Sequence, residues 1–231
     1  MHHFEMPDWA IQQAVSRRGR VHVFDKPDPL RTALLVIDMQ NAFLMDSVAH
    51  SPIPMARSIV PNVNRIAHAL REAGGLVVWI TTVVTEESLV SWSVCNDDLS
   101  TPQRRQKRYD AMREGSPGQE LWPDLDARPG DARIRKTRYS ALIQGSSPLE
   151  EFLRERSIDT LIVTGTVTGV CCESTARDAM MLNFKTIMIS DANAARSDAD
   201  HAAALVSFYV TFGDVMTTEG ILACLAKAVQ A

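Results

Sequence analysis

The sequence predicts a single α/β domain in which helices cover both faces of a mostly parallel, doubly wound sheet, giving three layers, α/β/α. Short apolar runs rich in β-branched residues alternate along the chain with segments of helical periodicity, and this alternation is typical of a parallel sheet. The chain has 231 residues and is 45% hydrophobic, which allows one sizeable core. Neither an internal repeat nor a linker divides it further.

Composition excludes several classes of function. The formal net charge is −4, so the chain lacks the basic excess that marks a nucleic-acid-binding protein. Its apolar runs fall short of the ~20 residues that a membrane-spanning helix needs. Four cysteines without regular spacing, and the lack of a recognisable signal peptide, favour reduced thiols and a cytoplasmic protein.

Most strands are predicted from continuous apolar runs, because a strand covered on both faces has apolar residues at every position. Residues 131–135 are shorter and only strand-like. Gly, Pro and polar residues bound these runs. In chain order the predicted strands span residues 32–40, 76–80, 131–135, 158–163, 184–190 and 214–216.

The helices are predicted where apolar residues recur every three to four positions. The clearest spans residues 59–73 and ends at two glycines, which commonly follow a helix. Ser197 and Asp200 have the spacing of a capping box and open a helix that runs to about Phe212. Further helices are predicted at residues 148–156, at 171–182 and from 218 onwards.

Two segments have a weaker pattern. Residues 1–30 are predicted to form an N-terminal arm with a short helix, ahead of a domain at 31–231. The arm could pack on the domain or on a neighbouring subunit, and a solvated tail is an equal alternative.

Residues 88–130 form a long irregular excursion. They contain a basic run, which would usually be a solvated face. A segment of this length is also often a lid or a binding loop. The run consists of Arg104, Arg105, Lys107 and Arg108.

The most informative segment is 161–179, which reads as a buried strand, a turn with two glycines and a helix. Cys171 lies where the turn becomes the helix, so its thiol faces the positive end of the helix dipole, which favours the thiolate. Acyl-transfer enzymes present their nucleophile in this way. Alternatively, Cys171 is a small apolar residue of the core. The adjacent Cys171 and Cys172 do not form a metal motif, and the glycine spacing does not fit a dinucleotide site.

Polar groups also follow the other predicted strands. Asp38 ends the first strand, Thr82 follows the second and Lys136 follows the third. Open α/β sheets bind their ligands at the carboxyl ends of the strands, so these side chains are candidates for a site. A lone aspartate such as Asp38 could equally cap the following turn.

Three segments together resemble the isochorismatase-like cysteine hydrolases, a superfamily that includes nicotinamidase, N-carbamoylsarcosine amidohydrolase and ureidoacrylate amidohydrolase. The segments are Leu34–Phe43, Lys136–Ala141 and Gly165–Ala179, and the resemblance covers about residues 30 to 226. It implies the isochorismatase-like fold and a homodimer or homotetramer.

By this resemblance Cys171 is the nucleophile, Asp38 is its base and Lys136 is the neighbouring cation. A cis peptide bond between Thr166 and Val167 turns a backbone N–H toward the substrate, and the N–H groups of Val167 and Cys171 form the oxyanion hole. The implied reaction is hydrolysis of the C–N bond of a small amide, carbamoyl or ureido compound through a thioester, with release of ammonia.

The resemblance also bears on the ligands. Tyr139 and Thr82 are expected to contact the substrate. Nicotinamidases bind a metal ion through an aspartate and two histidines, whereas residues 81–87 contain no histidine here. We therefore predict neither a metal nor another cofactor, and we expect His50 and His68 at the surface. The alternative is a non-catalytic member that binds a small metabolite or a partner through the same crevice.

Overall fold

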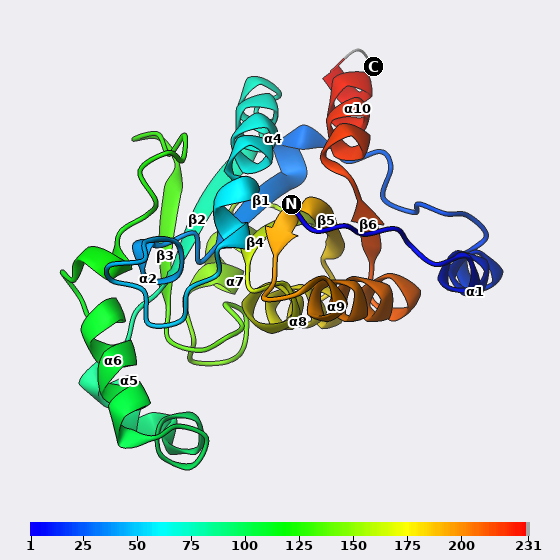
Figure 1. The fold of residues 1–231 in the computed structure, drawn as a ribbon. Coiled ribbons are helices and arrows are strands. Elements are labelled where there is room, and N and C mark those ends of the chain that lie inside the picture. Colours follow the sequence, from blue (N-terminus) through cyan, green and yellow to red (C-terminus); the bar gives the residue numbers. More distant parts are fainter. Residues whose placement is uncertain (230–231) are drawn as a thin grey trace.

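The computed structural model describes residues 1–229, and one β-sheet between two layers of helices forms its centre (Figure 1). Within these residues the sheet has six strands in the order β3-β2-β1-β4-β5-β6, paired in parallel throughout. This confirms the predicted doubly wound α/β fold. Residues 230 and 231, the end of the predicted domain, lie outside the described residues. The strands are β1 Thr32–Ile37, β2 Leu76–Thr82, β3 Ala132–Lys136, β4 Thr160–Thr166, β5 Lys185–Ala194 and β6 Asp214–Met216.

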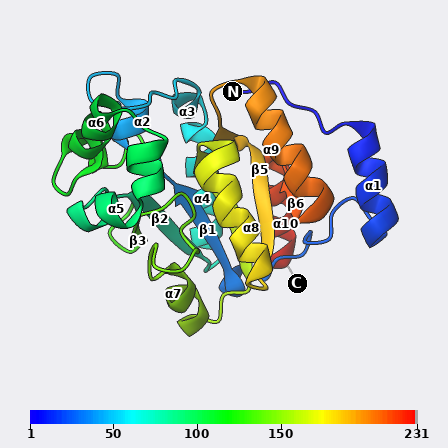
Figure 2. The same ribbon diagram turned by 90° about the horizontal axis from the view of Figure 1, so that it is seen from below.

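Alternate side chains of the sheet supply two separate cores. Leu34 and Val36 of β1 face one helical layer, and Leu35 and Ile37 face the other. All four side chains are fully buried, which explains the continuous apolar run. Figure 2 shows the second layer crossing the sheet. The first layer holds α4 Val60–Glu72 and α10 Thr218–Val229, and the second holds α7 Leu149–Glu155, α8 Glu173–Met181 and α9 Asp198–Thr211. In the part of the chain that the structure describes, no helix is long and apolar enough to span a membrane.

Strand β5 is longer than predicted. It continues to Ala194 instead of ending at residue 190. Its pairing with β4 shifts register on the way, and the side chain of Asn193 bridges the irregularity by donating hydrogen bonds to the carbonyl oxygens of Val163 (2.9 Å) and Ile189 (2.7 Å). A polar residue therefore extends the strand past its apolar run.

The excursion at residues 88–130 is irregular only in part: its first half is largely helical, whereas residues 113–130 are irregular apart from a short helical turn and an isolated bridge. It contains α5 Glu86–Ser91 and α6 Pro102–Met112, separated by a single helical turn. Thr101 caps the start of helix α6, and its hydroxyl accepts a hydrogen bond from the Arg104 N–H (3.3 Å). The apolar periodicity is missing because α6 buries only its carboxyl-terminal end against the domain.

The N-terminal arm packs on the domain. Helix α1 Asp8–Arg18 lies against α9, and the Arg17 guanidinium donates to two carbonyl oxygens at the end of that helix. The Arg18 guanidinium pairs with the buried carboxylate of Asp214 (3.1 Å) and lies 4.3 Å from the ring centre of Tyr209. These contacts anchor the arm at the β6 edge of the sheet.

The first residues of the arm meet a buried histidine of α9. The ring of His201 stacks on that of His2 with the centroids 4.4 Å apart, and its Nδ1 lies 2.9 Å from the hydroxyl oxygen of Thr168. Burial lowers the pKa of His201 to about 4, so this side chain is neutral at pH 7.

This pKa predicts a dependence of stability on pH. The pKa of a histidine in the unfolded chain is ~6.5, so between pH 6.5 and about 4 the unfolded chain binds one more proton than the fold at His201. The free energy of unfolding must therefore fall as the pH is lowered through this range. We expect a His201→Asn variant to lose stability less steeply than the wild type, by up to ~1.4 kcal/mol per pH unit near pH 5.

Urea unfolding at pH 7 and pH 5 would measure this difference in slope. His68 is exposed, and a His68→Asn variant should keep the wild-type slope. An equal slope in His201→Asn and the wild type would contradict the prediction.

Candidate active site

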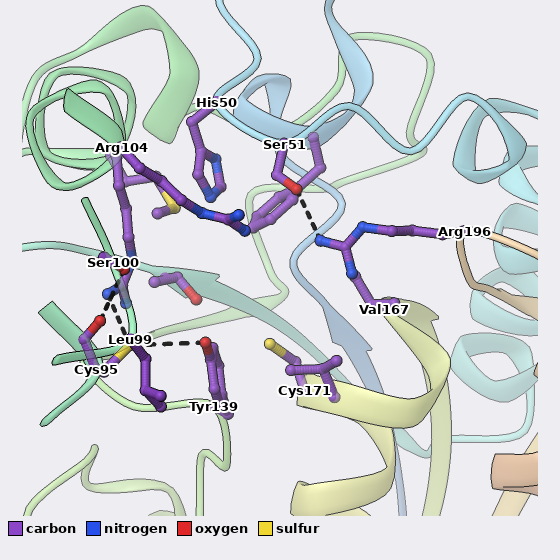
Figure 3. A pocket seen from close by; sticks show the side chains of 15 residues that line it. His50, Ser51, Cys95, Leu99, Ser100, Arg104, Tyr139, Val167, Cys171 and Arg196 are labelled. Carbon is purple, nitrogen blue, oxygen red and sulfur yellow. Dashed lines mark hydrogen bonds between the residues drawn. The ribbon is translucent and has the colours of Figure 1, made fainter. Parts of the chain in front are cut away.

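Side chains from the carboxyl end of the sheet border a cavity of about 190 Å³ (Figure 3). Cys171, Thr82, Tyr139 and Val167 all line it. Three strands that are neighbours in the sheet each place one polar residue at this end of the sheet. β1 leads into Asp38, β2 ends at Thr82 and β3 ends at Lys136. The structure thus brings the predicted site residues together.

Asp38, Thr82 and Lys136 form a closed, buried triangle of hydrogen bonds. The Thr82 hydroxyl donates to Asp38 Oδ1 (2.8 Å), and Lys136 Nζ donates to Asp38 Oδ2 (2.9 Å) and to Thr82 Oγ1 (2.6 Å). A further bond runs from Lys136 Nζ to the carbonyl oxygen of Arg138 (3.1 Å). An ammonium group has three donors, so each donor of Lys136 has an acceptor.

The backbone around Asp38 is unusual. Asp38 has φ +55°, in the left-handed region that residues other than glycine rarely adopt. Beside it, Gly165 of β4 has φ +119°, and a Cβ there would lie 2.1 Å from the carbonyl oxygen of Ile37. Only glycine therefore fits at Gly165, and its close approach brings β4 and the turn after it next to Asp38.

Cys171 lies in the helical turn Thr168–Cys172, which leads directly into α8. Figure 3 shows its sulfur pointing into the cavity, although the residue is only 6% exposed. Cys172 is fully buried, with its sulfur 3.9 Å from the carbonyl oxygen of Thr164. Of these two cysteines, Cys171 is therefore the one that a ligand in the cavity would meet.

The charge state of the thiol differs from the expectation. Burial and the carboxylate of Asp38 raise the pKa of Cys171 to about 12, so the dipole-based expectation of a thiolate was wrong. A local helix dipole does not outweigh desolvation. Burial would also lower the pKa of the Lys136 ammonium, but the carboxylate of Asp38 outweighs this effect and the pKa is raised. The free site therefore holds a neutral thiol beside an ion pair.

Within the described chain, one backbone N–H group before Cys171 is free beside the cavity. The peptide bond between Thr166 and Val167 is cis. The N–H of Val167 has no acceptor within residues 1–229, and Val167 borders the cavity.

The two predicted substrate contacts have different surroundings. Tyr139 is 43% exposed, and its hydroxyl lies 3.7 Å from Cys95 Sγ. Burial and the neighbouring Cys95 raise the pKa of Tyr139. Thr82 lines the cavity, but its hydroxyl is held by Asp38 and Lys136. It therefore positions these charged groups instead of being free to bind a ligand.

His50 does not lie at the surface, so that expectation was wrong. It is half-buried and lines the cavity, with Nδ1 3.3 Å from the carbonyl oxygen of Ala42. Burial, assisted by nearby arginines, lowers the pKa of His50 to about 4, so the ring is neutral at pH 7. His68 is exposed, as expected.

Gln40 is a positioning residue that the sequence analysis missed. Its side-chain amide donates to the carbonyl oxygen of Thr82 (3.1 Å) and accepts from the Thr82 N–H (2.7 Å). It thereby continues the β1–β2 ladder beyond the end of β1 and fixes Thr82. The sequence did carry a signal for this role. The apolar run of the first strand leads, two residues after Asp38, into a residue with a polar amide side chain.

A metal centre was not predicted, and the described residues contain no group of three or more His, Cys, Asp or Glu side chains placed to hold a metal ion. The polar groups that face one another at this site are those of Asp38, Lys136, Thr82 and Cys171. A thiol, a carboxylate and an ammonium group at the edge of a doubly wound sheet place the protein in the class of cysteine hydrolases.

Comparison with known proteins gives the family. A family model described as the isochorismatase domain matches residues 32–220. The chain belongs to the isochorismatase family of hydrolases, which confirms the resemblance seen in the three sequence segments.

Solved structures agree. A cysteine hydrolase from Pseudomonas syringae pv. phaseolicola is 28% identical, with a TM-score of 0.75, over 87% of this chain and 95% of that chain. An isochorismatase family protein from Desulfovibrio vulgaris is 25% identical, with a TM-score of 0.72, over 85% and 98%. An N-carbamoylsarcosine amidase from Thermoplasma acidophilum is 26% identical, with a TM-score of 0.65, over 82% and 97%.

The triangle of hydrogen bonds predicts the effect of a Thr82→Val substitution. It removes the hydroxyl that bonds Asp38 and Lys136, so buried polar groups lose a partner at a cost of ~1–3 kcal/mol. Misplaced catalytic groups should lower kcat about 10- to 100-fold. Steady-state hydrolysis kinetics and urea unfolding would measure both effects.

Thr81 is a matched control, because it is half-buried and borders a different cavity. A Thr81→Val variant should keep the wild-type kcat. If Thr82→Val raised KM and left kcat unchanged, Thr82 would be a substrate contact, as first expected.

Proposed function

We propose that this protein is a cysteine-dependent amidohydrolase that hydrolyses the C–N bond of a small amide, carbamoyl or ureido compound and releases ammonia. The observation that carries the proposal is the buried pair of Asp38 and Lys136 beside the cavity-facing thiol of Cys171. The similarity to the solved structure of an N-carbamoylsarcosine amidase supports a substrate whose C–N bond is hydrolysed.

The first step is proton transfer coupled to attack. Because the pKa of Cys171 is raised, the thiol attacks the substrate carbonyl carbon as its proton passes to the Asp38 carboxylate. Lys136 stays charged and stabilises the electron density that develops on the thiol sulfur and the substrate. The Thr82 hydroxyl holds the carboxylate in place during this transfer.

The tetrahedral intermediate carries a negative oxygen, which the N–H groups of Val167 and Cys171 bind. Its collapse breaks the C–N bond, and protonated Asp38 gives its proton to the leaving nitrogen. Ammonia departs and the acyl group remains on Cys171 as a thioester. Water then attacks the thioester with Asp38 as base, which releases the acid and restores the thiol.

We expect Asp38→Asn and Cys171→Ala each to lower kcat at least ~10²-fold, since each removes a group needed before the thioester forms. The double variant should be barely worse than either single variant, because the two groups act in one step. Ammonia release from a panel of small amides, carbamoyl and ureido compounds would measure this.

Cys172→Ala is the matched control. Its thiol lies in the core, so it should retain activity. A Cys171→Ala variant with more than a tenth of the wild-type activity would contradict the covalent mechanism. A wild-type protein that bound members of the panel without releasing ammonia would support the non-catalytic alternative instead.

Activity should also survive removal of divalent metals. The mechanism uses only side chains and backbone of this chain, and the described residues offer no cluster of metal ligands. Dialysis against a chelator followed by the ammonia assay would test this. A loss of activity that zinc restored would show that a metal takes part.

Two further expectations stay predictions: that the protein forms a homodimer or homotetramer, and that it is located in the cytoplasm.

A further inference from the structure

The cavity in front of Cys171 carries an unbalanced positive charge. Arg104, Arg108 and Arg196 all line it, and among the described residues that border it none is Asp or Glu. Within residues 1–229 no carboxylate lies within ion-pair distance of these three guanidinium groups. Arg105 on the same helix differs, because it points away and pairs with Asp97 (2.7 Å). Of the three arginines on this helix, the one with a carboxylate partner is therefore the one that does not line the cavity.

The arginines come from two sides of the cavity. Arg104 and Arg108 are four residues apart on α6, so they lie on one face of that helix. Arg196 follows β5. In Figure 3 the side chains of Arg104 and Arg196 extend from opposite sides into the space between them, with Cys171 below. A group held between Arg104 and Arg196 would therefore lie near the reactive sulfur.

Two of the guanidinium groups are held in place while most of their donors remain free. Arg196 donates through Nη2 to the Ser51 hydroxyl (2.8 Å). Arg108 donates through Nη1 to Asn96 Oδ1 (2.8 Å), and its guanidinium lies 5.1 Å from the ring centre of Trp92. Each guanidinium has five N–H donors. Arg108 Nη1 also donates to Cys95 Sγ (3.4 Å). The remaining donors of Arg108 and Arg196 meet no acceptor in the part of the chain that the structure describes.

The surroundings do not neutralise this charge. His50 is uncharged, and Arg108 and Arg104 contribute to the low pKa of its ring after burial itself. Like charges gathered at a cavity repel one another, and field lines concentrate where low-dielectric walls surround them. An anion between the guanidinium groups would relieve this repulsion. A planar carboxylate fits the fork of an arginine through two parallel hydrogen bonds.

We propose that the substrate carries a carboxylate on the side away from its scissile amide, and that Arg104 and Arg196 bind this carboxylate with Arg108 adding to the field. The inference rests on the proposed amidohydrolase function and narrows its substrate to small amide, carbamoyl or ureido acids. The cavity of about 190 Å³ corresponds to about six water molecules at ~30 Å³ each. A short acid fits this space.

Matched pairs of compounds test the preference for an acid. Succinamate is paired with butanamide, and N-carbamoylglycine with ethylurea. The wild type should show a kcat/KM at least ~tenfold higher for the acid of a pair, as expected for a charge-assisted hydrogen bond. The ratio of kcat/KM, acid to neutral, should fall at least ~tenfold in Arg104→Gln and in Arg196→Gln, mainly through KM. Arg105→Gln is the matched control on α6 and should keep the wild-type ratio.

Binding to a Cys171→Ala protein separates this inference from the proposed function, because binding needs no turnover. The shift in Tm caused by millimolar succinamate should exceed that caused by butanamide, and Arg196→Gln in the same background should abolish the difference. This result without ammonia release by the wild type would support the carboxylate subsite and reject the amidohydrolase.

Three results would overturn the inference. The first is equal kcat/KM for the acid and neutral members, which would leave the amidohydrolase standing. The second is binding of acids that is absent at millimolar concentration or unchanged by both arginine substitutions. The third is stronger stabilisation by inorganic phosphate than by succinamate, which would assign the subsite to a phosphate group.

Discussion

The buried ion pair between Asp38 and Lys136 is the interaction on which the rest of the site depends. Both side chains are fully buried, and Lys136 Nζ lies 2.9 Å from Asp38 Oδ2. Removing each charge from water costs desolvation free energy, and the fold tolerates that cost only because the opposite charge is present. Removing one partner of such a pair costs about 3–5 kcal/mol, since an uncompensated charge is left behind. The pair also constrains the topology. Its members come from β1 and β3, and Thr82 of the intervening β2 bonds to both, so the strand order β3-β2-β1 is what places them together.

Cys171, the proposed nucleophile, reaches this pair from the other side of β1. Strand β4 is the second neighbour of β1, and Gly165 lets the two strands approach closely just before their ends. The site therefore lies where successive strands are added on opposite sides of β1, the switch point at which open α/β sheets bind ligands. In the proposed mechanism Asp38 takes a proton from Cys171 while Lys136 remains charged. The base and its counterion are thus available without a permanently charged thiolate.

The parts of the molecule that depend on local sequence could be predicted, and those that depend on packing could not. Asp38 and Cys171 follow apolar runs and Lys136 follows a short strand-like segment, so their place after strands could be read from the sequence. Arg104 and Arg108 belong to a helix with little apolar periodicity, and which of its faces meets the cavity depends on how α6 packs. The charge state of Cys171 was predicted wrongly because a helix dipole is a local feature, whereas desolvation and the Asp38 carboxylate arise from the tertiary structure.

The proposed catalytic groups and the arginines belong to different parts of the fold, and this separation has a physical consequence. The catalytic groups lie at strand ends that the whole sheet holds in place, whereas Arg104 and Arg108 come from α6 and Arg196 from the connection after β5. The charge of Asp38 is already balanced by Lys136, so the arginines are not needed to neutralise it. Substitutions in α6 or after β5 can therefore change which ligand the cavity attracts without disturbing the ion pair. Under the two proposals, reactivity and substrate choice are accordingly set by separate charges, one pair buried in the sheet and one group on the cavity wall.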